Sequence, residues 1–236
     1  MARLVGAHPD VGRAPAPAVL PPSLRGWLGP LAALAALVVV VLGTRYADDR
    51  KPGAMDAWIW AAVDGAGPSW RYVALAMDFL GEPVGSATLV VTTVTGCLWL
   101  RRPRAAVFAV AGTGLTVGTA TLLKSLVGRT IHGDHLSYPS GHTAFLTALC
   151  LVVALLVTGR LGLGGAAGTL LVSAAALVAG AAMGWAQVAL GAHYPTDVVG
   201  GWCTAVAVTS ATGWLVDRTA DWLVDRGADA GRPEHR

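Results

Sequence analysis

The chain has 236 residues, of which 54% are hydrophobic and only 13% are charged. Soluble domains carry about 25% charged residues, so this composition excludes an ordinary water-soluble domain and indicates a membrane protein. The formal net charge is +3, and its distribution along the chain is more informative than its sum.

Six apolar blocks approach the ~20 residues that a helix needs to cross a bilayer. They cover residues 27–43, 83–100, 104–127, 142–158, 165–186 and 196–216. The sequence therefore predicts an all-α fold, a six-transmembrane-helix bundle. Three cysteines, Cys97, Cys150 and Cys203, lie inside these blocks, which argues against a disulfide framework or a cysteine zinc site.

The parts outside the blocks divide the chain further. Residues 1–26 are rich in proline and alanine, and we expect a disordered cytoplasmic tail before a membrane domain at 27–216. Residues 45–82 mix acids with tryptophans, which prefer the headgroup level, and this favours short interfacial helices over a plain loop. A short repeat, residues 214–218 and 222–226, predicts that the last span continues into a cytoplasmic interfacial tail at 217–236.

The positive charges favour one orientation of the bundle. With the N-terminus inside, eleven of the 17 lysines and arginines fall in cytoplasmic segments and six fall outside. The short basic turn at 101–104 is the tightest signal. The positive-inside rule therefore predicts that both termini are cytoplasmic. We expect an integral protein of a bacterial plasma membrane.

Two histidine fragments then face outward, and the first opens the fourth block. Ser140 and Gly141 precede His142, where a helix N-terminus and a hydroxyl offer hydrogen-bond donors to a phosphate. Such a fragment is also typical of an ordinary helix cap. Lys124, near the end of the third block, can hold an anionic headgroup or extend its amine to the interface.

The second fragment places Asp197 four residues after His193 at the start of the sixth block. A carboxylate at this spacing can accept a hydrogen bond from the imidazole, fix its tautomer and leave the other nitrogen free to attack. The alternative is a helix-capping aspartate beside an interfacial histidine. Two histidines and one carboxylate are a minimal set for phosphoryl transfer.

Together these residues resemble the type 2 phosphatidic acid phosphatase / haloperoxidase superfamily. Its three motifs are Lys-x6-Arg-Pro, Pro-Ser-Gly-His and Ser-Arg-x5-His-x3-Asp. Lys124 matches the first lysine, residues 139–142 match the second motif, and His193 with Asp197 matches the third. The resemblance covers about residues 30–216, in the same order and with the six-span architecture of the membrane members.

The resemblance implies a role for each matched residue. His193 would form a phosphohistidine, Asp197 would orient it, and His142 would be the general acid. Lys124, Ser140 and the Gly141 amide would bind phosphoryl oxygens. To these we add two candidate phosphate ligands that match no motif residue, Arg129 and Gln187. No cofactor, metal or nucleic-acid partner is implied, and the partners would be the bilayer and a lipid phosphate substrate. The oligomeric state stays open.

Two motif arginines are absent. Ile131 and His132 stand where the first motif has Arg-Pro, and Ala186 and Gln187 stand where the third has Ser-Arg. Two lost charge-assisted hydrogen bonds can cost about 3–6 kcal/mol. Arg129, which lies two residues before Ile131, is our first candidate to replace the lost charge, followed by His132 and His135. A metal site on the loop of His132, Asp134 and His135 is less consistent with its short spacing than a solvated polar turn.

The sequence therefore predicts an integral membrane phosphatase that hydrolyses a lipid phosphate or polyprenyl diphosphate through phosphohistidine at an outward-facing site. Two alternatives stay open. One is a lipid phosphotransferase with the same intermediate, and the other is a degenerate, non-catalytic member that binds lipid headgroups. The missing arginines favour the second alternative, and the retained histidines and Asp197 oppose it.

Overall fold

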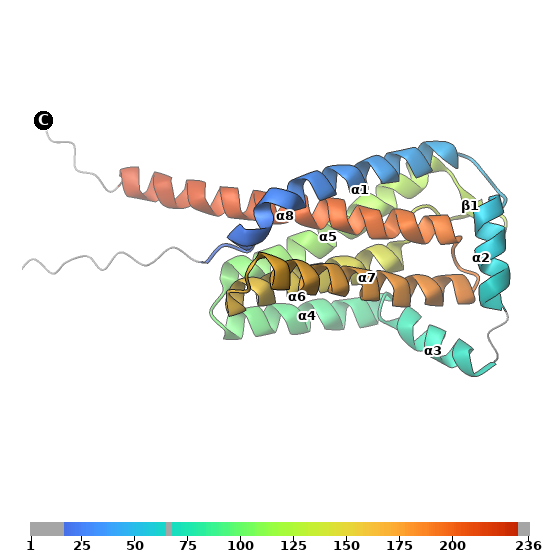
Figure 1. Ribbon diagram of the computed structural model, residues 1–236, viewed down its shortest axis with the longest axis horizontal. Coiled ribbons are helices and arrows are strands. Elements are labelled where there is room, and N and C mark those ends of the chain that lie inside the picture. Colours follow the sequence, from blue (N-terminus) through green and yellow to red (C-terminus); the bar gives the residue numbers. More distant parts are fainter. Residues whose placement is uncertain (1–16, 65–67, 231–236) are drawn as a thin grey trace, which may run out of the picture.

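The computed structural model describes residues 17–64 and 68–230, and this part of the chain is almost entirely helical (Figure 1). Its eight α-helices are α1 (Arg25–Arg45), α2 (Ala54–Asp64), α3 (Pro68–Phe79), α4 (Pro83–Trp99), α5 (Pro103–Val127), α6 (Gly141–Leu161), α7 (Gly165–Ala189) and α8 (Pro195–Ala230). A 3₁₀ turn at Pro22–Leu24 precedes α1, and a two-residue hairpin pairs β1 (Thr130–Ile131) with β2 (His135–Leu136).

Local sequence signals explain where the long helices begin and end. Prolines open α4, α5 and α8, where the missing N–H costs nothing. Gly128 ends α5 with a φ of 67°, a left-handed conformation that glycine adopts without steric penalty. Ser140 caps α6, because its side chain accepts a hydrogen bond from the N–H of Thr143.

Five helices are long and apolar enough to cross a membrane: α1, α5, α6, α7 and α8. A sixth span forms if α3 and α4 are taken together, since these two helices are bent by 59° at the break between them. The predicted all-α membrane bundle is confirmed, and five of the six predicted blocks correspond to these five helices. The predicted block at 83–100 corresponds to α4, which reaches the length of a span only together with α3. The chain is an integral membrane protein.

The arrangement of the bundle brings one set of helix ends together. The C-terminal ends of α1, α5 and α7 meet the N-terminal ends of α6 and α8 at one end, where α2 and α3 lie across the bundle (Figure 1). An apolar core of residues such as Phe108, Val152 and Leu155 holds α1, α5, α6, α7 and α8 together. Both histidine fragments therefore lie at the end covered by α2 and α3.

The opposite end of the bundle ties the start of the described chain to α8. Val19 and Leu20 are buried, and their N–H groups donate to the Asp217 carboxylate at 2.8 and 3.1 Å. Arg25 forms an ion pair with the same carboxylate at 3.1 Å. Part of the predicted disordered tail, residues 17–26, is thus packed against the bundle, whereas residues 1–16 lie outside the described residues.

Helix α8 is longer than a bilayer requires. Its 36 residues extend over about 54 Å at 1.5 Å per residue, against about 30 Å of hydrocarbon. The chain continues as one helix through the predicted boundary at residue 216, and its last turns project from the bundle (Figure 1). Trp214 and Trp222 are about half exposed there, with Arg218 and Arg226 over their rings.

Candidate active site

His193 lies in the short loop between α7 and α8, and its side chain is only 8% exposed. Its Nδ1 faces Oδ2 of Asp197 at 3.7 Å, longer than a hydrogen bond, and has no hydrogen-bond partner. Pro195 starts α8, so Asp197 falls in the first turn with its side chain toward the loop. The two residues are neighbours, as their spacing predicts.

Asp197 is fully buried and held by contacts from three directions. Its Oδ1 accepts from Nη1 of Arg129 at 2.6 Å, and its Oδ2 accepts from the N–H of Tyr194 at 3.0 Å. Its backbone carbonyl accepts from the N–H of Ser140 at 2.9 Å. A carboxylate that accepts several hydrogen bonds is fixed in place and favoured in its charged form.

Arg129 is fully buried, and its guanidinium pairs with carboxylates. Its Nη1 also donates to the Thr196 hydroxyl at 2.6 Å, and its Nη2 donates to Oδ2 of Asp56 at 2.7 Å. Asp56, on α2, accepts in addition from the N–H of Thr196 at 2.9 Å. We call these four residues, Arg129, Asp56, Thr196 and Asp197, the Arg129 network.

Two aromatic rings complete the surroundings of this guanidinium. The rings of Tyr46 and Tyr194 lie 4.2 and 4.4 Å from its central carbon, at distances typical of cation–π contacts. Both terminal nitrogens of Arg129 donate to carboxylates, so this geometry does not provide the phosphate contact that we expected of Arg129. The reason is that Asp56 and Asp197 already pair with these two nitrogens.

The Pro-Ser-Gly-His fragment forms the start of α6 beside Asp197. Ser140 is buried, and its hydroxyl lies 3.0 Å from that of Thr143 while it caps the helix. A Cβ built on Gly141 would meet nothing within 4 Å, so open space lies beside this residue. A Cβ on Gly201 would overlap the Ser140 carbonyl, so glycine is needed for α8 to pack this closely against α6.

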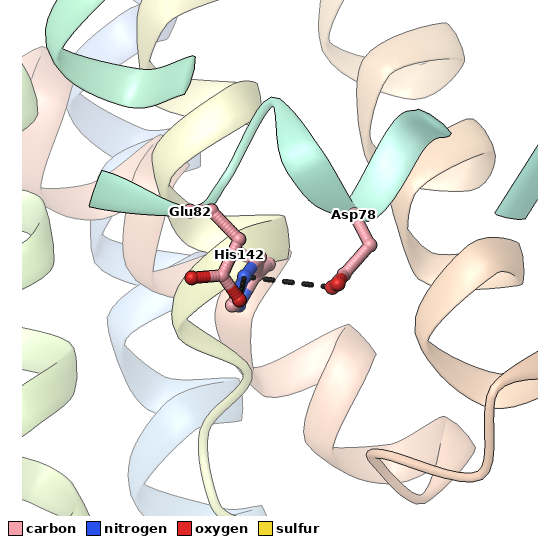
Figure 2. A group of neighbouring side chains, drawn as sticks. All are labelled: Asp78, Glu82 and His142. Atoms are coloured by element: carbon pink, nitrogen blue, oxygen red, sulfur yellow. Dashed lines mark ion pairs between the residues drawn. The ribbon is translucent and has the colours of Figure 1, made fainter. Parts of the chain in front are cut away.

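His142, on the first turn of α6, faces two carboxylates from the bend between α3 and α4 (Figure 2). Its Nε2 lies 3.5 Å from Oδ1 of Asp78 and 3.5 Å from Oε1 of Glu82. This nitrogen is buried without a hydrogen-bond partner. A Cβ on Gly81 would overlap the imidazole, so glycine lets the bend cover it. We call Asp78, Glu82 and His142 the Asp78 cluster.

Gln187 belongs with this cluster and not with Arg129. It is buried near the end of α7, and its Nε2 donates to Oδ1 of Asp78 at 2.6 Å. The amide therefore joins α7 to α3, at the position where the resemblance leads us to expect an arginine. It is neutral, so the carboxylate of Asp78 receives a hydrogen bond here but no positive charge.

The three remaining candidates lie on or near the β1–β2 hairpin. Lys124 is half-buried in the last turn of α5, and its Nζ donates to the carbonyl of Leu136 at 3.1 Å. His132 is exposed and contacts the carbonyl of Gly191 at 2.9 Å. His135 is exposed on β2. Among the described residues, neither side chain contacts His142, His193 or Asp197.

The electrostatics of His193 favour a neutral ring. Burial lowers the pKa of His193, and the nearby charge of Lys124 lowers it further. Asp197 opposes both effects by favouring the protonated form. An imidazole that stays neutral keeps a lone pair available for attack on an electrophile.

The structure thus brings His193, Asp197 and Ser140 together directly, and Lys124 acts on His193 through its charge. It adds three acids, Asp56, Asp78 and Glu82, whose roles the sequence did not indicate. One signal was present: Asp56 and Asp78 each stand in a mostly apolar helix, where a carboxylate costs desolvation unless it is paired.

Comparisons with known proteins agree with this architecture. A family model described as the PAP2 superfamily matches residues 87–220. The fold is similar to the crystal structure of a transmembrane PAP2-type phosphatidylglycerolphosphate phosphatase from Bacillus subtilis, with a TM-score of 0.63 and 20% identity. The match covers 87% of this chain and 98% of that one. No curated protein matches the sequence.

Proposed function

Because the chain belongs to the PAP2 superfamily, we propose that it is an integral membrane phosphatase that hydrolyses a lipid phosphate or polyprenyl diphosphate through a phosphohistidine. One observation carries the proposal. The N–H of Ser140 donates to the carbonyl of Asp197, which joins the Pro-Ser-Gly-His fragment to the His193 loop in one buried unit. A protein that only binds headgroups does not need a histidine, an orienting carboxylate and a second histidine at one helix end.

In the first step, Nε2 of His193 attacks phosphorus, because Nδ1 is turned toward Asp197. The P–N bond forms as the bond from phosphorus to the leaving oxygen breaks, and that oxygen takes its proton from His142. Lys124, the Gly141 N–H and the open space beside Gly141 accommodate the phosphoryl group. Asp197 stabilises the positive charge that develops on His193.

In the second step, water attacks the phosphohistidine and the P–N bond breaks. The proton from water passes to His142, and inorganic phosphate leaves. His193 returns to its neutral state, which its burial favours. The Arg129 network holds Asp197, so that Arg129 acts as a positioning residue and not as a phosphate ligand.

The test is phosphate release by the purified protein and its His193→Ala variant, across a panel of lipid monophosphates and polyprenyl diphosphates. We expect release by the wild type on at least one substrate and at least a ~10³-fold loss in the variant, since a nucleophile is removed. A matched control is His135→Ala, an exposed histidine of the same end of the bundle. Equal inertness of wild type and His193→Ala on every substrate would overturn the proposal.

The distribution of lysine and arginine supports an outward-facing site in a bacterial plasma membrane, with both termini cytoplasmic. Single cysteines test this. In a background without the three native cysteines, Asp134→Cys on the exposed hairpin should react with a membrane-impermeant maleimide in intact cells. Arg101→Cys, on the exposed α4–α5 turn, should react only after lysis. The reverse pattern would place the site on the cytoplasmic side.

A further inference from the structure

We propose that Asp78 is a positioning residue for His142, whose ring it holds in one tautomer and one orientation. The general acid thus has a carboxylate partner, as the nucleophile His193 has Asp197. Asp78 matches no residue of the three motifs. The inference rests on the proposed function, since it assigns a part in that reaction.

The first argument is the position of the carboxylate. Oδ1 of Asp78 lies 3.5 Å from Nε2 of His142, and this nitrogen is buried without a hydrogen-bond partner (Figure 2). A buried N–H without a partner costs free energy. Catalytic hydrogen bonds are often longer in a free enzyme than in its complex with substrate. An N–H on Nε2 that donates to Asp78 removes the cost.

The second argument is that the carboxylate of Asp78 is itself held. The side-chain amide of Gln187 donates to the same Oδ1 at 2.6 Å. The backbone carbonyl of Gln187 accepts from the N–H groups of Ala192 and His193 at 2.9 and 3.3 Å. One residue therefore supports the loop of the nucleophile with its main chain and the partner of the acid with its side chain.

Glu82 is the other carboxylate near the ring, and it is less suited to the role. Its Oε1 also lies 3.5 Å from Nε2 of His142. The side chain of Glu82 is 51% exposed, against 25% for Asp78, so solvent screens its charge more strongly. We therefore assign the positioning role to Asp78.

The third argument is that the bend between α3 and α4 covers one edge of the His142 ring. A Cβ on Gly81 would overlap Cδ2, the ring carbon next to Nε2, so the backbone at Gly81 closes that edge. Nδ1 belongs to the opposite edge. With the N–H of Nε2 directed at Asp78, the tautomer is fixed and Nδ1 is the nitrogen that exchanges a proton.

This assignment specifies the proton transfers of the proposed reaction. In the first step, the protonated ring of His142 gives the proton on Nδ1 to the leaving oxygen as the bond from phosphorus to that oxygen breaks. The ring keeps its N–H on Nε2, directed at Asp78. In the second step, Nδ1 takes a proton from the attacking water as the P–N bond breaks. The ring ends the cycle protonated on both nitrogens, as it began.

The experiment compares two substrates, octyl phosphate and a nitrophenyl phosphate that carries an octyl tail. An alkoxide must be protonated as it leaves, whereas a nitrophenolate is stable as an anion. We measure kcat/KM, which includes only the steps up to departure of the leaving group, so hydrolysis of the phosphohistidine does not enter. The wild type, Asp78→Asn and Asp134→Asn are compared, each with its unfolding temperature in detergent.

We expect Asp78→Asn to lower kcat/KM for octyl phosphate by at least ~100-fold, with a loss at least ~10-fold smaller for the nitrophenyl ester. Asp134→Asn, on the exposed hairpin, is the matched control and should change neither value. Equal losses on the two substrates, or no loss on octyl phosphate, would overturn the proposal. Gln187→Ala keeps the carboxylate but removes its hydrogen bond, and should give a smaller loss with the same selectivity if Asp78→Asn does not fold.

A second measurement does not depend on turnover. Heteronuclear NMR of the protein with isotope-labelled histidine shows which nitrogen of the neutral His142 ring carries the proton, and His142→Gln identifies the signal. We expect the proton on Nε2 in the wild type and a mixture of tautomers in Asp78→Asn. A proton on Nδ1 in the wild type would contradict the proposal. If wild type and His193→Ala are equally inert on every substrate, the phosphatase function fails, and the tautomer still decides the role of Asp78.

Discussion

The Arg129 network and the Asp78 cluster lie at the same end of the bundle, and each contacts one of the two histidines. In the first, every side-chain carboxylate is fully buried, and contacts of 2.6–3.0 Å join α2, α8 and the end of α5. In the second, the carboxylates are 25% and 51% exposed and approach His142 no closer than 3.5 Å. His193 thus lies beside a fully buried, closely hydrogen-bonded network, whereas the carboxylates around His142 are more exposed and lie farther from the imidazole.

This difference shows where the chain tolerates change. A buried ion pair resists the loss of either partner, because the other charge is left without compensation. Half-exposed carboxylates are still solvated and lose little when one is neutralised. Substitutions in the two places should therefore separate stability from chemistry.

The largest effect is expected for Arg129→Ala. It leaves Asp56 and Asp197 buried without their cation, and breaking such a pair costs about 3–5 kcal/mol. We expect a strong fall in the yield of folded protein and in the unfolding temperature in detergent. Arg45→Ala is the matched control, since Arg45 lies over the same Tyr46 ring but is exposed. Equal stability of the two variants would remove the distinction between network and cluster.

The second effect is on catalysis. Asp197→Asn keeps the shape of the side chain but removes the charge that faces His193, and we expect about a 10³-fold loss of phosphate release per folded molecule. Asp217→Asn is the control, because Asp217 is also buried but lies at the opposite end of the bundle. It should lower stability and leave the turnover of the folded fraction unchanged. If Asp217→Asn reduces turnover as much as Asp197→Asn, the effect is structural.

The third effect concerns the Asp78 cluster. Gln187→Arg places a permanent positive charge beside Asp78, and one charge-assisted hydrogen bond is worth about 1.5–3 kcal/mol. Phosphate release should therefore rise by about 10- to 150-fold. Gln187→Met, which has no charge, is the control. A gain of the same size for methionine would point to packing and not to charge.

The smallest effect is a dependence of stability on pH. Burial lowers the pKa of His193, so the folded state binds this proton less readily than the unfolded state. The contribution of neutral His193 to the free energy of unfolding is intact above the pKa of the unfolded state, about 6.5, and is lost as the pH falls below that value. The charges of Asp197, Lys124 and His142 act on this group as well. His193→Gln should flatten the acid side of the stability profile, and an unchanged profile would contradict the assignment.

The apolar blocks predicted the helices well, because about twenty consecutive apolar residues have few alternatives in a bilayer. The pattern of apolar residues does not predict which contacts the side chains in loops make. Arg129 follows α5 directly, and nothing in its neighbourhood of the sequence shows that its partners come from Asp56 on α2 and Asp197 on α8. We expected a phosphate role for Arg129 because it lies two residues before the position of the missing motif arginine, whereas in the fold its guanidinium pairs with Asp56 and Asp197.

The spacing of His193 and Asp197 was informative because it is local, within one turn at a helix start. The sequence did not predict that His142 lies beside Asp78 and Glu82, since this arrangement depends on the bend between α3 and α4. Gly81 marks that bend, but a glycine in a loop has many uses, and its contact with the His142 ring becomes visible only in three dimensions.

The Asp217 carboxylate also bears on how the bundle is made. It receives the N–H groups of Val19 and Leu20 and the guanidinium of Arg25, which belong to the first part of the described chain to leave the ribosome. Their partner, Asp217, lies on α8, the last helix of the described chain. During synthesis these contacts can form only after α8 has been made. Chains that stop before residue 217 lack this closing contact.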